Sequence, residues 1–487
     1  MDSSTSYTHG TSNILCQITS KLEHFLQKHN MTGPKTQTPI PDGLNDIETA
    51  VYQKIIDAVS TLRKQSFDIP HVVVITDVGK DYDDLAAMIL LKELHRLGAI
   101  KLEGFIANLL PEDARAHLAR QSLDLLGLED IPVGQGTRGT EKNISPDLYE
   151  FPVSVMGKKP YPKQLRGLEL LQQLKNNAER DNYKLTFLLI SSLQDISDFE
   201  RSLRPKDSSE LHPLKHVIAK VVLQGNYKLD QSRDNSKEPT SHSILKADQG
   251  AANNDFHWPS AQNFHSFLDR EEISSVVYNK IAAYGTPLRP TIFSEMAETG
   301  QTLGIALRDI EAPQNILYYK GACRMINGKS APIMKDRDQQ WFLLRRTTYF
   351  DTREREINPE LLPDPESEEI VEYCKVIVYD VLAALGTCPE AVLDALDVLE
   401  TPDYERQPDH NKLHRVVGIT PRMNPDTATQ EELDAAAQLN EDEENPFKSP
   451  ASTNAETMKN VIEALLKGAL LDCKAKGIGQ AKVEDRF

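Results

Sequence analysis

His71-Val-Val-Val-Ile-Thr76, followed at once by Asp77-Val-Gly-Lys-Asp-Tyr-Asp-Asp84, is the stretch that decides the fold of this chain. The first six residues form an unbroken run rich in β-branched side chains, which is typical of a strand buried on both faces of a parallel sheet. A helical pattern follows over about 83–97. The stretch therefore predicts a buried strand, an acidic loop and a helix in direct succession.

Further strands and helices alternate on the C-terminal side of this unit. Buried strands are expected over 102–108, 131–133, 185–191 and 217–223, with a helix over 112–126. Such alternation predicts βαβ units and hence an α/β fold with an open, mostly parallel sheet flanked by helices. Ligands in these sheets bind outside the carboxyl ends of the strands, so the residues that follow each strand are the candidates for ligand binding.

The composition narrows the class of protein. Of 487 residues, 39% are hydrophobic, which is enough for a sizeable core, and 55 basic against 73 acidic residues give a net charge of −18. This charge argues against nucleic-acid and anionic-membrane partners. The five cysteines form no CxxC pair, and no apolar run reaches the length of a membrane span. We therefore expect a cytoplasmic, enzyme-sized protein.

Four regions follow from the patterning. Residues 1–66 predict an N-terminal extension with helices near 14–26 and 44–62, and residues 67–420 predict the α/β domain, with a polar loop at 227–250. Residues 421–453 read as an acidic linker and 454–487 as a C-terminal helix and tail. A capping box from Thr453 to Glu456 is expected to start this last helix.

The loop after the first strand holds four aspartates within eight positions, Asp77, Asp81, Asp83 and Asp84. Helix capping accounts for Asp83 or Asp84 alone. It does not account for four mutually repelling carboxylates, which need a counter-charge such as calcium or magnesium. An EF-hand is excluded, because Gly79 and Met88 stand where that motif needs oxygen ligands.

This loop resembles the fingerprint D-x-D-P-G-x-D-D-A-x-A-[LIM] of the inosine-uridine-preferring nucleoside hydrolases. It departs from the fingerprint in three ways: Ile75 replaces the first acid, Val78 replaces the proline, and two extra residues precede Asp83. Those two residues are Lys80 and Asp81, to which we assign no role beyond solvating a longer loop.

Other stretches resemble the same family in the same chain order. They cover about residues 70–395 and are Gly104–Asn108, the segment 189–195, Gly225-Asn226, the segment 251–261, and the segment 378–384. The resemblance implies the nucleoside hydrolase fold and a calcium ion that serves hydrolysis of an N-glycosidic bond in a ribonucleoside.

The resemblance also implies a role for each matching residue. It assigns the calcium ion to the carboxylates of Asp77, Asp84 and Asp380 and to the backbone carbonyl of Gln194, with Asp77 as the general base. Six further residues would bind the substrate: Asp83, Asn108, Asn226, Asn253, Asp255 and Tyr379. The family pattern E-x-N appears with acid and amide exchanged, as Asn253-x-Asp255, and Tyr379 replaces a histidine often linked to leaving-group activation.

Three functions remain open from the sequence. The first is a calcium-dependent hydrolase of a ribonucleoside or related riboside. The second is the same fold recruited to another substrate in specialised metabolism, which the exchanged pair and Tyr379 favour. The third is a non-catalytic protein that binds calcium and a small riboside. The sequence leaves open the base preference and whether the chain forms a homo-oligomer.

Overall fold

The strand that opens the decisive stretch lies in the interior of an eight-stranded sheet. In this computed structural model the strands follow the order β13-β9-β6-β5-β1-β2-β3-β4, and every neighbouring pair is parallel. Their bounds are β1 His71–Thr76, β2 Lys101–Ala107, β3 Val133–Gln135, β4 Leu165–Arg166, β5 Leu185–Leu189, β6 Ile218–Gln224, β9 Ser275–Tyr278 and β13 His414–Val416. The predicted α/β class, with an open and mostly parallel sheet, is confirmed.

The structure describes most of the chain beyond residue 38. The described ranges are 39–143, 145–147, 149–151, 153–157, 159–207, 210–229, 245–326, 329–333, 337–350, 362–366, 368–400, 414–420 and 452–481. The helix expected near 14–26 and the linker residues 421–451 lie outside these ranges, as does the middle of the polar 227–250 loop.

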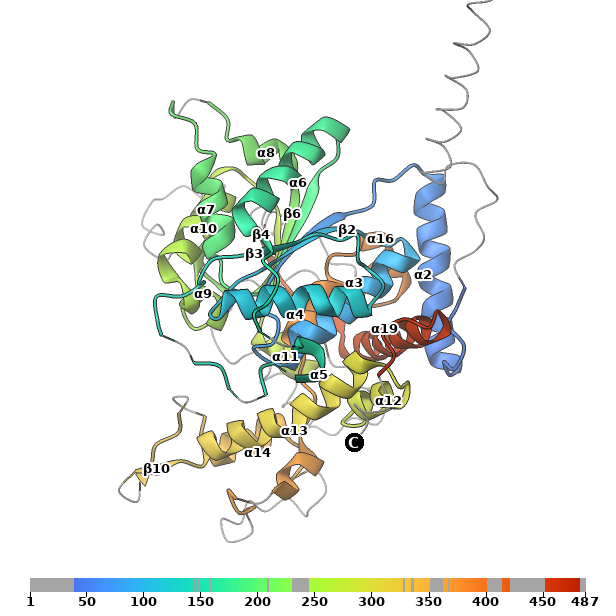
Figure 1. The fold of residues 1–487 in the computed structure, drawn as a ribbon, viewed down its shortest axis with the longest axis vertical. Coiled ribbons are helices and arrows are strands. Elements are labelled where there is room, and N and C mark those ends of the chain that lie inside the picture. The colour runs from blue at the N-terminus through green and yellow to red at the C-terminus, as the bar shows by residue number, and fades with distance from the viewer. Residues whose placement is uncertain are drawn as a thin grey trace, which may run out of the picture. The chain divides into compact units, whose positions relative to one another are not determined.

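Strand β1 shows why helices cover both faces of the sheet. Its side chains alternate between two separate hydrophobic clusters, with Val72 and Val74 in one and Val73 and Ile75 in the other. Helices on the first face are α2 Asp46–Lys64, α3 Tyr82–Leu97, α4 Glu112–Leu125, α12 Ile292–Glu298, α13 Thr302–Ala322, α15 Tyr379–Leu385 and α19 Ala455–Ala475. Helices on the second face are α6 Gly167–Asp181, α7 Gln194–Ser202, α8 Pro213–Val217 and α10 Trp258–Arg270. Figure 1 shows the two groups on opposite sides of the strands.

Smaller elements complete the fold. The helices are α5 Val153–Met156, α9 Ala252–Phe256, α11 Lys280–Gly285, α14 Gln339–Arg346, α16 Glu390–Ala395 and the 3-10 helix η3 Glu368–Tyr373. The short strands are β7 Tyr227–Leu229, β8 Leu245–Ala247, β10 Met325–Ile326, β11 Lys329–Ser330, β12 Leu399–Glu400, β14 Gly418–Thr420 and β15 Ser452–Asn454. Strands β7 and β8 pair in antiparallel fashion, so the described ends of the polar loop form a two-stranded ribbon.

The terminal helices α2 and α19 pack together against α3. The Tyr52 hydroxyl of α2 donates to Glu93 Oε1 of α3 at 2.6 Å, and Lys92 Nζ bonds Asp472 Oδ2 of α19 at 2.5 Å. Gly468 leaves room for Tyr52, because a Cβ there would lie 1.9 Å from the hydroxyl oxygen. The cap of α19 is Asn454, whose side chain accepts from Thr457 N, so the expected start at Thr453 was one residue early.

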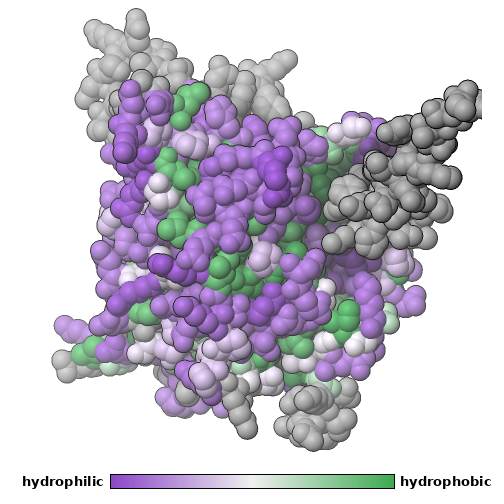
Figure 2. Space-filling model, turned by 45° about the horizontal axis from the view of Figure 1, so that its top comes forward, coloured by the Kyte–Doolittle hydropathy of each residue, from purple (hydrophilic) through white to green (hydrophobic). Residues whose placement is uncertain are grey.

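The surface in Figure 2 is hydrophilic over most of its area, with a band of apolar side chains across its middle. Scattered apolar residues are normal on a folded protein. Among the described residues, none of the helices has the length and apolar character needed to span a bilayer.

Candidate metal centre and ligand site

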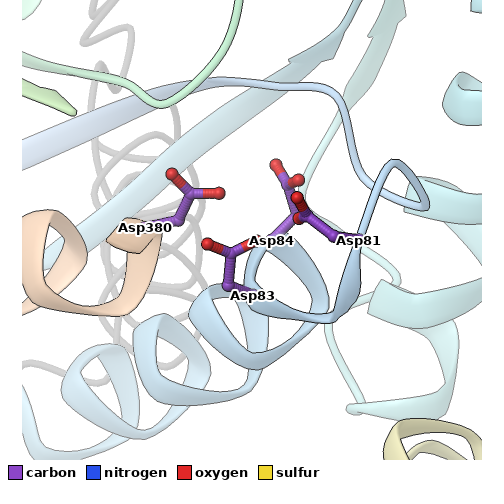
Figure 3. A group of neighbouring side chains, drawn as sticks. All are labelled: Asp81, Asp83, Asp84 and Asp380. Carbon is purple, nitrogen blue, oxygen red and sulfur yellow. The ribbon is translucent and has the colours of Figure 1, made fainter. Parts of the chain in front are cut away.

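Four carboxylates converge at the carboxyl edge of the sheet. Asp81 lies on the loop after β1, Asp83 and Asp84 lie in the first turn of α3, and Asp380 lies in the first turn of α15. Each offers one oxygen, and the four oxygens all lie within 4.8 Å of one another. Figure 3 shows their side chains pointing toward a common centre. Asp380 thus lies 296 positions after Asp84 in the sequence and beside it in space.

Hydrogen bonds and close packing fix the backbone of the loop that carries these acids. The Thr76 hydroxyl and, at 3.2 Å, the Asp77 backbone N–H both donate to Asp84 Oδ1. Gly79 has φ +92°, and a Cβ there would lie 2.6 Å from the Glu150 carbonyl oxygen, so the turn needs a glycine. Arg115 of α4 is fully buried and donates to the carbonyl of Asp77 at 3.0 Å. These contacts fix the backbone that presents the carboxylates.

The charges of the cluster are unfavourable without a cation. Burial raises the pKa of Asp83, Asp84 and Asp380 well above the ordinary value, and repulsion from neighbouring carboxylates raises it further. Burial also raises the pKa of Asp77 to about 7, against the opposing effect of Arg115. A divalent cation would reverse these shifts, because it favours the ionised form of every acid around it.

One oxygen of the cluster is left without a partner. Asp83 Oδ2 accepts a hydrogen bond from the backbone N–H of Tyr379 at 3.1 Å, whereas Asp83 Oδ1 is buried and bonds nothing among the described residues. An unsatisfied buried carboxylate oxygen costs free energy unless a ligand meets it. Hard cations bind carboxylate oxygens, so the residues present fit a divalent metal ion and the cluster can bind one.

Two of the expected metal ligands, Asp77 and Gln194, are not members of the group of four. Asp77 is buried and its charge acts on both Asp84 and Asp380, but it does not belong to the four mutually close carboxylates. Gln194 begins α7, after the neighbouring strand β5, and its side chain accepts from Gly139 N at 3.0 Å. That contact involves the side-chain amide of Gln194 and not its backbone carbonyl, which is the expected metal ligand.

The Asn108 side chain makes three hydrogen bonds to other protein groups. Its amide donates to the Ser192 carbonyl at 2.9 Å and to Asp195 Oδ2 at 2.8 Å, and its oxygen accepts from Ser191 Oγ at 2.6 Å. The residue is completely buried. Its side chain therefore joins the ends of β2 and β5, which is a structural task that needs no sugar.

Asn108→Ala is expected to lower the free energy of unfolding by about 1–3 kcal/mol, because it leaves buried partners on Ser191 and Asp195 unsatisfied. Urea unfolding of the parent and the variant measures this. Asn176→Ala, at an exposed position of α6, serves as the matched control and should change stability little. An Asn108→Ala variant as stable as the control would contradict the structural role.

The remaining sugar-binding candidates after β6 form a separate polar network. Asn226 donates to Asp248 Oδ2 at 2.9 Å, and Asn253 donates to Gln224 Oε1 at 2.7 Å. Asp255 binds Lys142 at 2.8 Å and Gln249 at 3.0 Å, with about a third of its side chain exposed. No hydrogen bond within the described ranges links this network to the four aspartates.

Tyr379 connects the aspartate cluster to an aromatic region. Its backbone N–H binds Asp83, and its hydroxyl donates to the Tyr284 hydroxyl at 3.0 Å. Burial raises the pKa of Tyr379 well above the ordinary value, with Tyr284 acting in the same direction and Arg346 against it. The tyrosine is therefore a neutral hydrogen-bonding group here.

Some site residues escaped the sequence reasoning. Asp81 lies within the carboxylate cluster rather than merely solvating the loop, and its place in the two-residue insertion concealed it. Its spacing two residues before Asp83 was the available signal. Arg115 contacts the loop that carries the aspartates, and Asp248 accepts a hydrogen bond from Asn226. Neither contact could be predicted from a local sequence pattern.

A cavity of about 830 Å³ lies far from these acids. Its lining includes Pro70, Lys184 and Ala219, which stand near the amino ends of β1, β5 and β6. It contains none of the clustered carboxylates. Ligands of open α/β sheets bind at the carboxyl edge, where the aspartates lie, so the cavity does not coincide with the candidate site.

No family model matches the sequence, and a search of curated proteins finds no match either. Among solved structures, the effector protein XOO4466 aligns with a TM-score of 0.58 at 18% identity, covering 88% of this chain and 99% of its own. The type III effector protein XopQ, solved in complex with adenosine diphosphate ribose, has a TM-score of 0.57 at 17% identity, covering 88% and 100%. At these identities the two likenesses show a shared fold.

A purine-preferring ribonucleoside hydrolase from Gardnerella vaginalis also aligns, with a TM-score of 0.43 at 13% identity, covering 82% of this chain and 99% of its own. The strand order and the carboxylate cluster define the chain as an open, parallel α/β protein with a candidate metal centre.

Proposed function

We propose that this protein is a calcium-dependent hydrolase that cleaves the N-glycosidic bond of a ribonucleoside or a related riboside. The observation that carries the proposal is the convergence of four aspartates at the carboxyl edge of the sheet, where one buried oxygen has no partner within the described part of the chain. Calcium accepts six to eight oxygen ligands in flexible geometry, which suits a crowded carboxylate cluster better than the strict octahedron of magnesium. The sequence resemblance to nucleoside hydrolases supports the choice of reaction.

The roles of the residues follow from their chemistry. A bound calcium ion would supply a nearby water of lowered pKa and a template for the ribose hydroxyls. Asp84 and Asp380 would hold the ion, together with Asp83 and Asp81. Asp77, buried beside them, would take the proton of the attacking water. The surrounding carboxylates would stabilise the positive charge that develops on the ribose as the bond to the base breaks.

A second function is favoured by specific contacts. Asn253 and Asp255 are engaged by Gln224, Lys142 and Gln249, so the exchanged pair already has protein partners. The similarly folded XopQ was solved with adenosine diphosphate ribose, which makes that riboside a ligand to test here. The alternatives are therefore a different riboside substrate, or calcium and riboside binding without catalysis.

Two measurements on purified protein in calcium separate these functions. A panel of nucleosides and adenosine diphosphate ribose is assayed for release of free base and reducing sugar, and for binding by calorimetry. Release that disappears on chelation supports the hydrolase. Binding without release supports the non-catalytic alternative, and absence of both from every riboside would contradict the proposal.

A further inference from the structure

A buried guanidinium lies close to the metal centre. Arg346, the last residue of α14, is 4% exposed. Its Nη1 donates to the Tyr379 hydroxyl at 3.4 Å, and its Cζ lies 4.8 Å from the centre of the Tyr318 ring. Its Nε is buried and has no hydrogen-bond partner among the described residues. At least one donor of this cation is therefore unused within the described part of the chain.

No carboxylate neutralises Arg346 among the described residues. Burial works to lower the pKa of Arg346, while four surrounding tyrosines, led by Tyr379, raise it overall. Glu311 of α13 acts on two of the same neighbours, Tyr82 and Cys374. Burial alone raises the pKa of Glu311 to about 7, however, and no ion pair joins it to Arg346.

Such a group is unfavourable in the free protein. A buried charge without a paired and hydrogen-bonded counter-charge costs free energy, and an apolar side chain of similar size often gives equal or greater stability at such a site. An anion bound beside Arg346 would supply the counter-charge that the described residues do not. The orphaned Nε is a donor that such an anion would satisfy.

The position of Arg346 connects it to the proposed ribose site. Tyr379 binds Asp83 through its backbone N–H and Arg346 through its hydroxyl, so a single tyrosine spans the distance between the two. Half-buried aromatic rings line the same region. Tyr284 packs edge-on against Trp341, with ring centres 5.9 Å apart.

A second arginine reinforces this positive region. Arg337 Nη1 donates to the Tyr318 hydroxyl at 2.8 Å, and its Cζ lies 5.0 Å from the centre of the Trp341 ring. Aromatic faces beside two guanidinium groups suit a flat ring and an oxyanion together, because arginine binds phosphate and carboxylate through its planar fork of donors.

We propose that Arg346, assisted by Arg337, binds an anionic group of the ligand, so that the preferred ligands are ribosides that carry a phosphate or a carboxylate. The proposal rests on the proposed riboside function and specifies its ligand class. The chemistry that these ligands share is an oxyanion bound at Arg346, which Tyr379 separates from the aspartate cluster. Its source is either a phosphate on the sugar or a carboxylate on the aglycone.

Arg346→Met tests the proposal, since it removes the charge and keeps most of the volume. Calorimetry in calcium compares ribose 5-phosphate with ribose, and orotidine, which carries a carboxylate on its base, with uridine, which lacks it. We expect the parent to prefer at least one anionic member over its neutral counterpart by about 10–100-fold, the range for a hydrogen bond to a charged group, and Arg346→Met to lose that preference. The first pair reports a sugar phosphate and the second an aglycone carboxylate.

Two further readouts make the result independent of riboside hydrolysis. In metal-free buffer, inorganic pyrophosphate should raise the melting temperature of the parent and leave that of Arg346→Met unchanged. Without ligand, Arg346→Met should melt at or above the parent temperature. The control Arg308→Met removes an exposed arginine that pairs with Asp309 and should retain every anion response of the parent.

The outcomes separate the two proposals. A parent that responds to pyrophosphate through Arg346 but binds no riboside would retain the anion site and sink the riboside function. A parent that binds uridine and ribose as tightly as the anionic ligands and does not respond to pyrophosphate would overturn the anion site and leave the riboside function standing. An Arg346→Met variant that keeps the anion preference would also overturn it.

Discussion

Asp84→Asn and Asp380→Asn should each weaken calcium binding by about 100-fold or more, because affinity of oxygen sites depends steeply on the number of charged ligands. Both residues belong to the group of four whose oxygens lie within 4.8 Å of one another. The asparagine keeps the size of the side chain, and at position 84 it keeps an oxygen that can accept from the Asp77 N–H. Calorimetric titration of metal-free protein with calcium measures the loss.

Without metal, the same variants should be more stable than the parent. Removing one of several repelling carboxylates relieves repulsion, so metal-free Asp84→Asn and Asp380→Asn should melt above the parent. In calcium the order should reverse, because only the parent gains the stability that comes with binding. Asp309→Asn, at an exposed position of α13, is the matched control and should follow the parent in both conditions. Unchanged calcium affinity in both cluster variants would refute the metal assignment.

The dependence on pH gives a further readout of the same cluster. The folded state raises the pKa of Asp77 to about 7 and raises that of Asp83, Asp84 and Asp380 well above the ordinary value. The folded protein therefore holds protons that the unfolded chain releases near pH 4. Metal-free stability from this source is fully present below about pH 4 and is lost as the pH rises through the raised values. Saturating calcium should flatten that decline, since the cation favours the charged carboxylates.

The sheet could be predicted because the hydrophobic pattern of its longer strands indicates burial on both faces. Val72 to Ile75 are continuous apolar residues, as burial on both faces requires, and strand alternation with helices implies parallel order. The order of the strands and the extra edge strands β4 and β13 could not be predicted in this way. Leu165–Arg166 is only two residues long and exposed, so it carries no pattern.

The carboxylate cluster was partly predictable for a similar reason. Asp83 and Asp84 are adjacent in sequence and follow a clear strand, and Asp380 belongs to a recognisable second segment. Asp81 was missed because an insertion displaced it from the fingerprint. Asn108 matched the family segment, but its three hydrogen bonds to protein groups depend on the β5–α7 loop, which sequence patterns do not position.

The environment of Arg346 could not be predicted from the sequence around it. Its neighbours in space come from α3, α11, α13 and α15, so nothing within the sequence around α14 indicates a buried cation beside the aspartates. Only the tertiary structure reveals that its charge has no carboxylate partner among the described residues. The ligand class is accordingly a structural inference, whereas the class of fold was already implied by the strand pattern.

Asp77→Asn should separate proton transfer from metal binding. The variant keeps the size of the side chain and an oxygen that can approach a cation, but it cannot accept a proton near neutral pH. The Asp77 side chain lies outside the group of four, so calcium should still bind, somewhat more weakly. If Asp77 is the base, kcat for riboside hydrolysis should fall by about 10²–10⁴, the usual contribution of a positioned general base.

The decisive measurement is kcat of Asp77→Asn at calcium concentrations raised until activity no longer changes. A base that has been removed cannot be restored by metal, so kcat should stay low at saturation while KM for the riboside changes less. Recovery of the parent rate at high calcium would mean that Asp77 acts only as a ligand to the ion. Full activity at ordinary calcium would remove Asp77 from the mechanism altogether, and the proton would then have to go to one of the four clustered carboxylates, of which Asp81 is the one whose side chain is not fully enclosed.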